Sequence, residues 1–322
     1  MSASPILIIL IMLSSAMCLS SNSWVSIWFL LEVNTLSFCV YMKSFVPSLK
    51  KNATTNSISY FIIQSVASSI LIFSALYSKM ELGKNSTCLA IMAMSLMIKM
   101  AAVPFHTWFI NIVKKSNWKA NVIVMTWQKL APTFLVIYQM KILVLPFILM
   151  SSFVGCLSQM NKVTLKEIMA FSSVFNISWS ILSILCNMKL FILFMTVYWM
   201  SVLMSMSLIF LAKSKSMSTQ PTEKIEKWIL FTVMINLAGV PPLAGFVSKW
   251  LVLLESITMK VVILTSILLV ISSMNLYIYM RMINSNIMKS MEKNQIVSKK
   301  STKSMTSIVI LISMATFPIV FI

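Results

Sequence analysis

The sequence predicts an all-α membrane protein, a polytopic bundle of transmembrane helices formed by residues 1–322 as a single domain. Hydrophobic residues make up 59% of the chain, and the mean hydropathy is +0.91. Charged residues make up only 10%, against about 25% in soluble proteins. Apolar runs of about 20 residues, the length that spans a bilayer, follow one another with short polar connections. Because no run alternates polar and apolar residues with period two, helices are favoured over a membrane barrel.

Clusters of polar and charged residues divide the chain into eleven apolar segments. Each is predicted to be one membrane-spanning region. The first is expected to be retained, because it lacks the basic residues of a signal peptide or a mitochondrial presequence. In chain order, the predicted spans are 5–20, 24–42, 58–77, 88–108, 120–139, 141–159, 165–186, 190–212, 228–254, 257–280 and 305–322.

The basic residues are distributed unevenly over the connections between these spans. Eighteen lysine and arginine residues lie in the even-numbered connections, and five lie in the odd-numbered ones. Basic residues concentrate on the side from which a membrane protein is inserted. The pattern therefore predicts that the N-terminus lies on the side of synthesis and that the C-terminus lies on the opposite side.

The composition argues against several other functions. The net charge of +19 does not predict nucleic-acid binding, because the lysines lie in short connections and not in one basic face or domain. The four glycines are too few for a Gly-rich phosphate loop. All seven acidic residues are glutamates, and the five cysteines are far apart without a CxxC pair. Neither a metal site nor an iron–sulfur cluster is therefore predicted.

Four charged residues lie inside predicted spans. They are Glu32 in the motif LLEVN, Lys99 in MIKMAAVPFHTW, Lys129 in MTWQKLAP and Lys249 in LAGVPPLAGFVSKW. A charge near the bilayer centre costs on the order of 2.5–3.5 kcal/mol, so such residues usually face the bundle interior and mark ion or proton pathways. We predict that the four form a proton relay. Two structural alternatives remain: a lysine, above all Lys249, that snorkels to the interface, and an ion pair of Glu32 that only fixes packing.

Prolines occur close to all three of these lysines. Pro104 follows Lys99 by five residues, and Pro132 follows Lys129 by three. Proline removes a backbone donor, and a membrane helix tolerates the break where water, polar side chains or protein contacts satisfy the freed carbonyls. A charged residue beside a broken helix is the usual construction of an ion site in transporters. The break before Lys249 is predicted at Gly239, Pro241, Pro242 and Gly245.

The only histidine, His106, follows Pro104 by two residues near the end of its predicted span. A proton carrier and an interfacial structural histidine are both compatible with this position. The sequence does not decide between the two, so the lysines take precedence as candidate site residues.

The four motifs LLEVN, MIKMAAVPFHTW, MTWQKLAP and LAGVPPLAGFVSKW closely resemble those of NADH dehydrogenase subunit 2, a mitochondrially encoded family of antiporter-like membrane subunits of respiratory complex I. The resemblance covers essentially the whole chain in length, span order and motif order. It implies an antiporter-like bundle with two discontinuous helices and a hydrophilic axis of charged residues at the membrane midplane. In that axis Glu32 and Lys99 resemble a Glu–Lys pair, Lys129 the central relay lysine, and Lys249 the lysine of the second broken helix.

The resemblance also implies where the protein works and with what. The expected function is proton translocation coupled to NADH oxidation by ubiquinone, in the mitochondrial inner membrane, with the N-terminus on the matrix side and the C-terminus on the intermembrane-space side. NADH, FMN, iron–sulfur clusters and ubiquinone are expected on other subunits, with no redox active site in this chain. The expected partners are other membrane-arm subunits, including neighbouring antiporter-like subunits, and the lipid bilayer. A cation/proton antiporter subunit and a non-conducting structural subunit remain alternatives.

Overall fold

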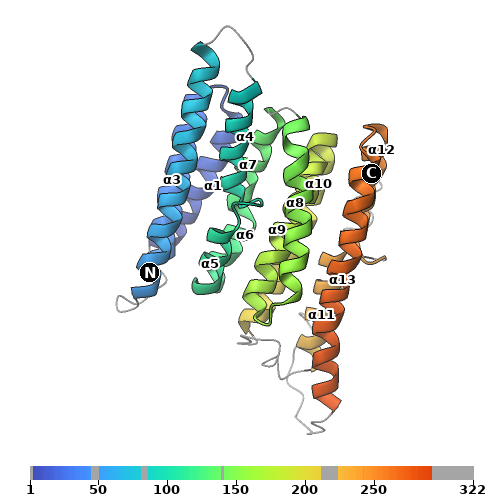
Figure 1. Ribbon diagram of the computed structural model, residues 1–322. Helices are drawn as coiled ribbons and strands as arrows, with labels where there is room; N and C mark the ends of the chain where they lie inside the picture. Colours follow the sequence, from blue (N-terminus) through green and yellow to red (C-terminus); the bar gives the residue numbers. More distant parts are fainter. Residues whose placement is uncertain are drawn as a thin grey trace. The chain divides into compact units, whose positions relative to one another are not determined.

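The computed structural model describes residues 3–44, 51–80, 86–138, 141–211, 224–241 and 243–291. These residues form helices, so the predicted all-α class is confirmed (Figure 1). In chain order the helices are α1 (Ala3–Ser20), α2 (Trp24–Ser44), α3 (Lys51–Met80), α4 (Ser86–Met100), α5 (Thr107–Lys115), α6 (Trp118–Met125), η1 (Trp127–Lys129), α7 (Leu130–Leu135), η2 (Val136–Tyr138), α8 (Lys141–Met160), α9 (Leu165–Cys186), α10 (Met188–Leu211), α11 (Lys224–Ala238), α12 (Ala244–Thr258) and α13 (Val262–Met291).

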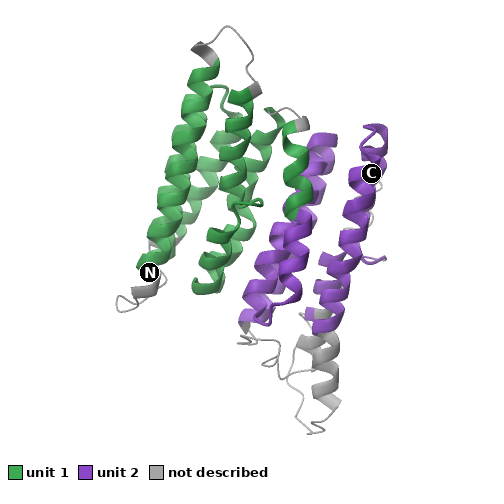
Figure 2. Cartoon of the chain, in the orientation of Figure 1, with its two compact units in different colours: residues 1–151 green, residues 152–322 purple. Residues whose placement is uncertain are grey.

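The helices are grouped into two compact units, Met1–Ser151 and Ser152–Ile322 (Figure 2). The first contains α1 to α7 and the beginning of α8, and the second contains the end of α8 and α9 to α13. Each unit has its own buried core and is described by itself below. The expectation of a single domain over residues 1–322 stays a prediction.

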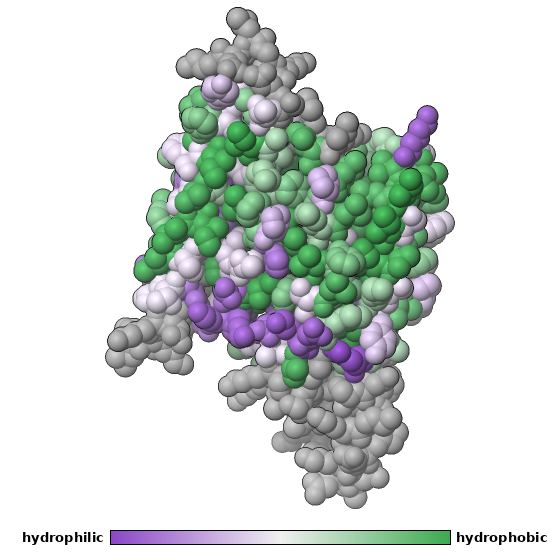
Figure 3. All heavy atoms as spheres, in the orientation of Figure 1, coloured by the Kyte–Doolittle hydropathy of each residue, from purple (hydrophilic) through white to green (hydrophobic). Residues whose placement is uncertain are grey.

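Helix is present in every predicted span except 305–322, which lies outside the described residues. Many outward-facing side chains are large and apolar, such as Phe73 and Ile263, and apolar side chains cover much of the face seen in Figure 3. Such a surface suits contact with lipid rather than water. Within the described residues, seven helical stretches are long and apolar enough to cross a membrane: Trp24–Ser44, Thr54–Ser78, Trp118–Tyr138, Leu143–Met160, Leu165–Cys186, Met188–Phe210 and Val262–Met282.

The predicted span 88–108 is interrupted between α4 and α5. Ala101 has a φ of 62°, and the N–H of Ala102 donates to the carbonyl of Met97 at 3.0 Å. This is the Schellman pattern, in which a left-handed residue ends a helix and its neighbour satisfies a terminal carbonyl. Pro104 lies in the connection that follows, before α5 begins.

The predicted span 120–139 is irregular between α6 and α7. Helix α6 ends at Met125, and Trp127–Lys129 forms the single 3-10 turn η1 before α7 begins. Pro132 lies within the first turn of α7, and its missing N–H cannot pair with the carbonyl of Gln128, four residues earlier. The irregular segment therefore precedes Pro132, and Lys129 lies at its end.

The break between α11 and α12 repeats the ending seen at α4. Gly239 has a φ of 85°, and its N–H donates to the carbonyl of Asn236 at 3.1 Å. The N–H of Val240 donates to the carbonyl of Ile235 at 3.4 Å, which completes a second Schellman pattern. Here a glycine occupies the left-handed position, where a side chain would be strained.

The start of α12 is held against the end of α11 by Asn236. Its side-chain oxygen accepts the N–H of Gly245 at 2.8 Å, which satisfies one of the free donors of the first turn of α12. A Cβ atom at Gly245 would lie 1.9 Å from the backbone oxygen of Asn236, so only glycine fits. Pro241 lies in the connection between the two helices, and Pro242 lies outside the described residues.

Replacing Gly245 with Ala is expected to destabilise the second unit, because the new Cβ collides with backbone that cannot easily move. Overpacking typically costs about 1–3 kcal/mol, and a melting temperature falls by roughly 2–4 °C per kcal/mol. Thermal unfolding of the detergent-solubilised protein measures the shift. Ser248→Ala is the matched control, since this buried hydroxyl in the same helix bonds only to the carbonyl of Gly245. Equal melting temperatures of the two variants would contradict the packing described here.

Candidate functional site

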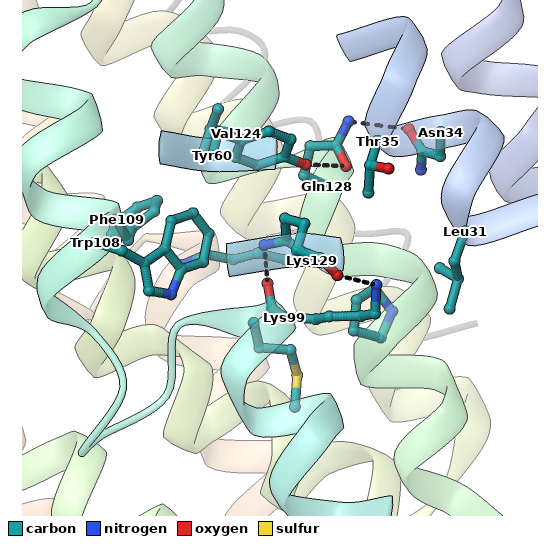
Figure 4. A pocket seen from close by; sticks show the side chains of 13 residues that line it. Leu31, Asn34, Thr35, Tyr60, Lys99, Trp108, Phe109, Val124, Gln128 and Lys129 are labelled. Carbon is teal, nitrogen blue, oxygen red and sulfur yellow. Dashed lines mark hydrogen bonds between the residues drawn. The ribbon is translucent and has the colours of Figure 1, made fainter. Parts of the chain in front are cut away.

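A small cavity lined by both polar and apolar side chains lies inside the first unit. Its volume is about 20 Å³, enough for a water molecule. Two of the predicted site residues, Lys99 and Lys129, line it from different helices (Figure 4). The other lining residues are Leu31, Asn34, Thr35, Tyr60, Gln64, Met100, Trp108, Phe109, Val124, Gln128 and Pro132.

Lys99 occupies the last turn of α4 and is only 5% exposed. Its Nζ donates a hydrogen bond to the backbone carbonyl of Gln64 at 3.3 Å. In return, the side-chain amide of Gln64 donates to the backbone carbonyl of Lys99 at 3.4 Å. The carbonyls of a last helical turn lack intrahelical partners and carry negative partial charge, so both the cation and the amide stabilise this helix end. Lys99 is therefore buried at the broken end of α4, with the backbone carbonyl of Gln64 on α3 as its partner.

Glu32 lies on α2 and is half-buried. Its carboxylate accepts hydrogen bonds from the hydroxyl of Ser68 on α3 and from Thr35 at 3.2 Å. The carboxylate is close enough to Lys99 to act on it electrostatically. The two residues are therefore coupled through space, while each is hydrogen-bonded to other groups. Protonation or movement of Glu32 would change the electric field at Lys99 without breaking a direct bond between them.

Lys129, at the end of η1, is only 4% exposed. Its Nζ lies 4.7 Å from the centre of the Phe109 ring on α5, a distance typical of a cation–π contact. Its backbone carbonyl accepts a hydrogen bond from Thr133 at 2.8 Å. The 3-10 turn thus places the ammonium group of Lys129 in the wall of the cavity that Lys99 also lines.

Neutral polar residues around these lysines were not anticipated from the sequence. The hydroxyl of Tyr60 donates to the side-chain oxygen of Gln128 at 3.3 Å, and the amide of Gln128 donates to Asn34 at 3.0 Å (Figure 4). Tyr60, Gln64 and Ser68 recur every four residues, so they form one polar face of α3. That spacing inside an apolar segment was the signal by which the sequence could have revealed them.

His106 lies in the connection between α4 and α5 and is half-buried. Its Nδ1 lies 3.3 Å from the backbone carbonyl of Pro104, a contact within its own segment. It is not among the described residues that line the cavity. A role of His106 as a proton carrier stays a prediction.

Lys249 belongs to the second unit. It is 7% exposed, and its Nζ donates to the backbone carbonyls of Leu237 at 3.1 Å and Ala238 at 2.8 Å. The rings of Phe175 and Trp179 on α9 have their centres 5.6 and 5.8 Å from Nζ. A buried ammonium with two backbone partners differs from the snorkelling arrangement that the sequence left open.

The side chain of Lys249 lies at the break between α11 and α12. Leu237 and Ala238 are the last residues of α11, so their carbonyls have no partner within the helix. A cation suits this negative end of the helix dipole. A Cβ at Gly239 would lie 3.1 Å from Cδ and 3.2 Å from Nζ of Lys249, so the glycine also makes room for the lysine.

The fold and its buried lysines in broken helices define a class of membrane protein. Residues 21–275 match the family described as NADH:quinone oxidoreductase/Mrp antiporter, TM. A structure of respiratory complex I from Thermus thermophilus has the same fold, with a TM-score of 0.76 and 17% identity over 98% of this chain and 76% of that chain. The Mrp complex from Dietzia sp. DQ12-45-1b matches with a TM-score of 0.71 and 17% identity over 86% of this chain and 59% of that chain. The chain is an antiporter-like membrane subunit.

More similar relatives give the particular family. NADH-ubiquinone oxidoreductase chain 2 of Anopheles gambiae is 31% identical over 95% of this chain and 92% of the relative. The protein of the same name from Locusta migratoria is 32% identical over 96% and 93%. The chain belongs to the family of NADH-ubiquinone oxidoreductase chain 2, an antiporter-like subunit of the membrane arm of complex I. The resemblance drawn from the four motifs is confirmed.

Proposed function

We propose that this chain is a proton-translocating module of mitochondrial complex I, in which Glu32, Lys99, Lys129 and Lys249 relay protons while NADH is oxidised by ubiquinone. The supporting observation is that Lys99 and Lys129 are both buried and line the same small cavity. Buried charges are costly in a membrane and mark ion pathways. A bundle that served only as a scaffold would have no need of two charged side chains around one cavity.

The relay needs each lysine to exist in a charged and a neutral form. Burial disfavours the charged form, because water no longer solvates the ammonium group. A neutral amine retains two N–H donors, so the single bond from Lys99 to Gln64 and the two bonds made by Lys249 survive loss of a proton. In a transfer between Lys99 and Lys129, an N–H bond of one ammonium group breaks and an N–H bond on the other amine forms, and a water molecule in the cavity that both residues line carries the proton.

Glu32 supplies the electrostatic control in this scheme. In a medium of effective dielectric constant about 20, a unit charge at about 8 Å changes an energy by about 2 kcal/mol. Moving one charge across a membrane potential of 100 mV takes about 2.3 kcal/mol. Protonation or displacement of one carboxylate therefore has the energy scale that a pumping step needs.

The rest of the setting belongs to the same proposal. The protein lies in the mitochondrial inner membrane, with its N-terminus in the matrix and its C-terminus in the intermembrane space, and this is supported by its family and by the lysine distribution. NADH, FMN, iron–sulfur clusters and ubiquinone are bound by other subunits, and this chain has no redox active site of its own. Its neighbours are other membrane-arm subunits, including antiporter-like ones.

Glu32→Gln and Lys99→Met are expected to lower proton pumping several-fold, because each removes one member of the coupled pair. The measurement is proton uptake per NADH oxidised by the complex reconstituted in vesicles. NADH oxidation by an artificial electron acceptor is expected to stay unchanged. Ser95→Ala is the control, since this buried hydroxyl lies one turn before Lys99 and bonds only to the carbonyl of Met92.

Other results of this experiment would assign a different role to the pair or to the chain. Unchanged pumping in both variants would exclude the pair from the relay. Sodium-dependent exchange by vesicles without NADH-linked activity would favour a cation/proton antiporter subunit. Less assembled complex on native gels, with normal pumping by the complex that does assemble, would favour a structural subunit.

A further inference from the structure

A second set of buried polar side chains lies in the second unit, between α8 and α13. It consists of Gln159 near the end of α8 and of Asn275 and Tyr279 on α13, here called the α8–α13 cluster. The three residues are 0%, 0% and 1% exposed. The thiol of Cys156 on α8 donates to the carbonyl of Ile271 on α13 at 3.7 Å, so the two helices are in contact beside the cluster. Asn275 and Tyr279 are four residues apart and therefore share one face of α13.

Five side-chain atoms of the α8–α13 cluster have no hydrogen-bond partner: Nε2 and Oε1 of Gln159, Nδ2 and Oδ1 of Asn275, and the hydroxyl of Tyr279. The hydroxyl of Tyr279 faces both amides and Ser172 on α9, but forms an ordinary hydrogen bond with none of them. Nearly all buried polar groups in proteins are paired, and buried water supplies the missing partners where side chains do not. Amide N–H donors, amide oxygen acceptors and a hydroxyl group therefore converge in the cluster, as the binding of a water molecule requires.

Helix α9 links this cluster to Lys249. Ser172, Asn176 and Trp179 follow one another at a spacing of four and three residues, so they lie along one face of the helix. The Nδ2 of Asn176 and the Nε1 of Trp179 are buried and also lack partners. The ring of Trp179 in turn lies against Lys249. From Ser172 to Trp179 the helix rises by about 10 Å, a distance that a few water molecules can span.

The other end of the cluster lies next to a helix end. Gln159 is followed by Met160, the last residue of α8, whose carbonyl accepts a hydrogen bond from the guanidinium group of Arg281. Arg281 is itself partly exposed and follows Tyr279 by two residues. Unpaired polar groups therefore extend from the edge of the predicted membrane span toward Lys249.

We propose that the α8–α13 cluster binds water molecules and that these waters, with Ser172 and Asn176, form a proton path between Lys249 and the membrane surface at which α8 ends. The path rests on the proposed function of this chain, whereas the water site does not. A proton enters as hydronium, and each water molecule accepts one proton and passes another on. The last transfer forms an N–H bond on the neutral amine of Lys249, and no water is consumed.

The water site is tested by a structure of the assembled complex at a resolution that shows ordered water. We expect density within about 3.2 Å of the hydroxyl of Tyr279 and of both amides of the cluster. The variant Gln159→Leu, which keeps a similar volume, is expected to lose this density. A dry cluster in the unaltered protein, with its side chains paired to one another, would overturn the water site and the path together.

The path is tested by proton uptake per NADH in vesicles. Gln159→Leu is expected to lower it several-fold, and Tyr279→Phe removes a single hydroxyl should the first variant fail to assemble. Ser205→Ala is the control, because this buried hydroxyl of the same unit bonds only to the carbonyl of Val202. Ordered water with full pumping by both cluster variants would overturn the path. Ordered water with full pumping by Lys249→Met would overturn the proposed relay and leave the water site intact.

Discussion

Replacing Lys129 with Met is expected to reduce coupled proton pumping by about a hundredfold or more, the scale on which a positioned proton-transfer group contributes, while the protein becomes no less stable. Lys129 is buried, and its Nζ faces the Phe109 ring. Met has a similar length, fills the same space and makes favourable contacts with aromatic rings. Burying an ammonium group in a membrane protein costs free energy that an apolar side chain of similar volume does not cost. In Lys129→Met, proton pumping should therefore fall while the melting temperature stays the same or rises.

Proton uptake in vesicles and the melting temperature of the assembled complex together check this expectation. Lys129→Arg is the informative companion, because arginine keeps the charge but does not release a proton near neutral pH. It is expected to pump as poorly as the Met variant and to be less stable. Pumping at the normal rate by either variant would show that titration of Lys129 is not needed.

The order of the helical segments between residues 5 and 280 could be predicted because a bilayer demands apolar runs of a fixed length. The places where helices break were less accessible. Pro132 marks an irregular segment, but the irregularity precedes it, since a proline disturbs the turn before its own position. Ala101 ends α4 in a left-handed conformation that glycine normally adopts, so the alanine in the sequence does not indicate the end of the helix. The division between the two units falls inside α8, where no change of composition marks it.

The buried charged residues could be located from the sequence because a charge stands out in an apolar run, whereas their hydrogen-bond partners are marked far more weakly. Gln64, the partner of Lys99, is neutral, and only its four-residue spacing with Tyr60 and Ser68 marks it in the sequence. The partners of Lys249 are the backbone carbonyls of Leu237 and Ala238, which no side-chain pattern reveals. The sequence therefore located the lysines and the breaks beside them, and the structure added the helix-end carbonyls to which Lys249 donates.

Replacing Lys249 with Met is expected to reduce pumping as strongly as the Lys129 substitution does, but to lower the stability of the protein. Its Nζ is the partner of two carbonyls at the end of α11, and both would be left buried and unpaired. Each such group costs about 1–3 kcal/mol, so the melting temperature should fall by several degrees. Both substitutions remove the same charge with the same new side chain, and only the partners of the lysine differ.

Lys249→Gln separates the two roles of this residue. Its amide has two N–H donors and can still reach toward the end of α11, although the side chain is one bond shorter, but it does not titrate. It should recover part of the stability lost in Lys249→Met without recovering pumping. If Lys249→Met proved as stable as the unaltered complex, the hydrogen bonds to Leu237 and Ala238 would not be what holds the two half-helices together. If Lys249→Gln pumped normally, Lys249 would serve as a helix cap and the relay would end before it.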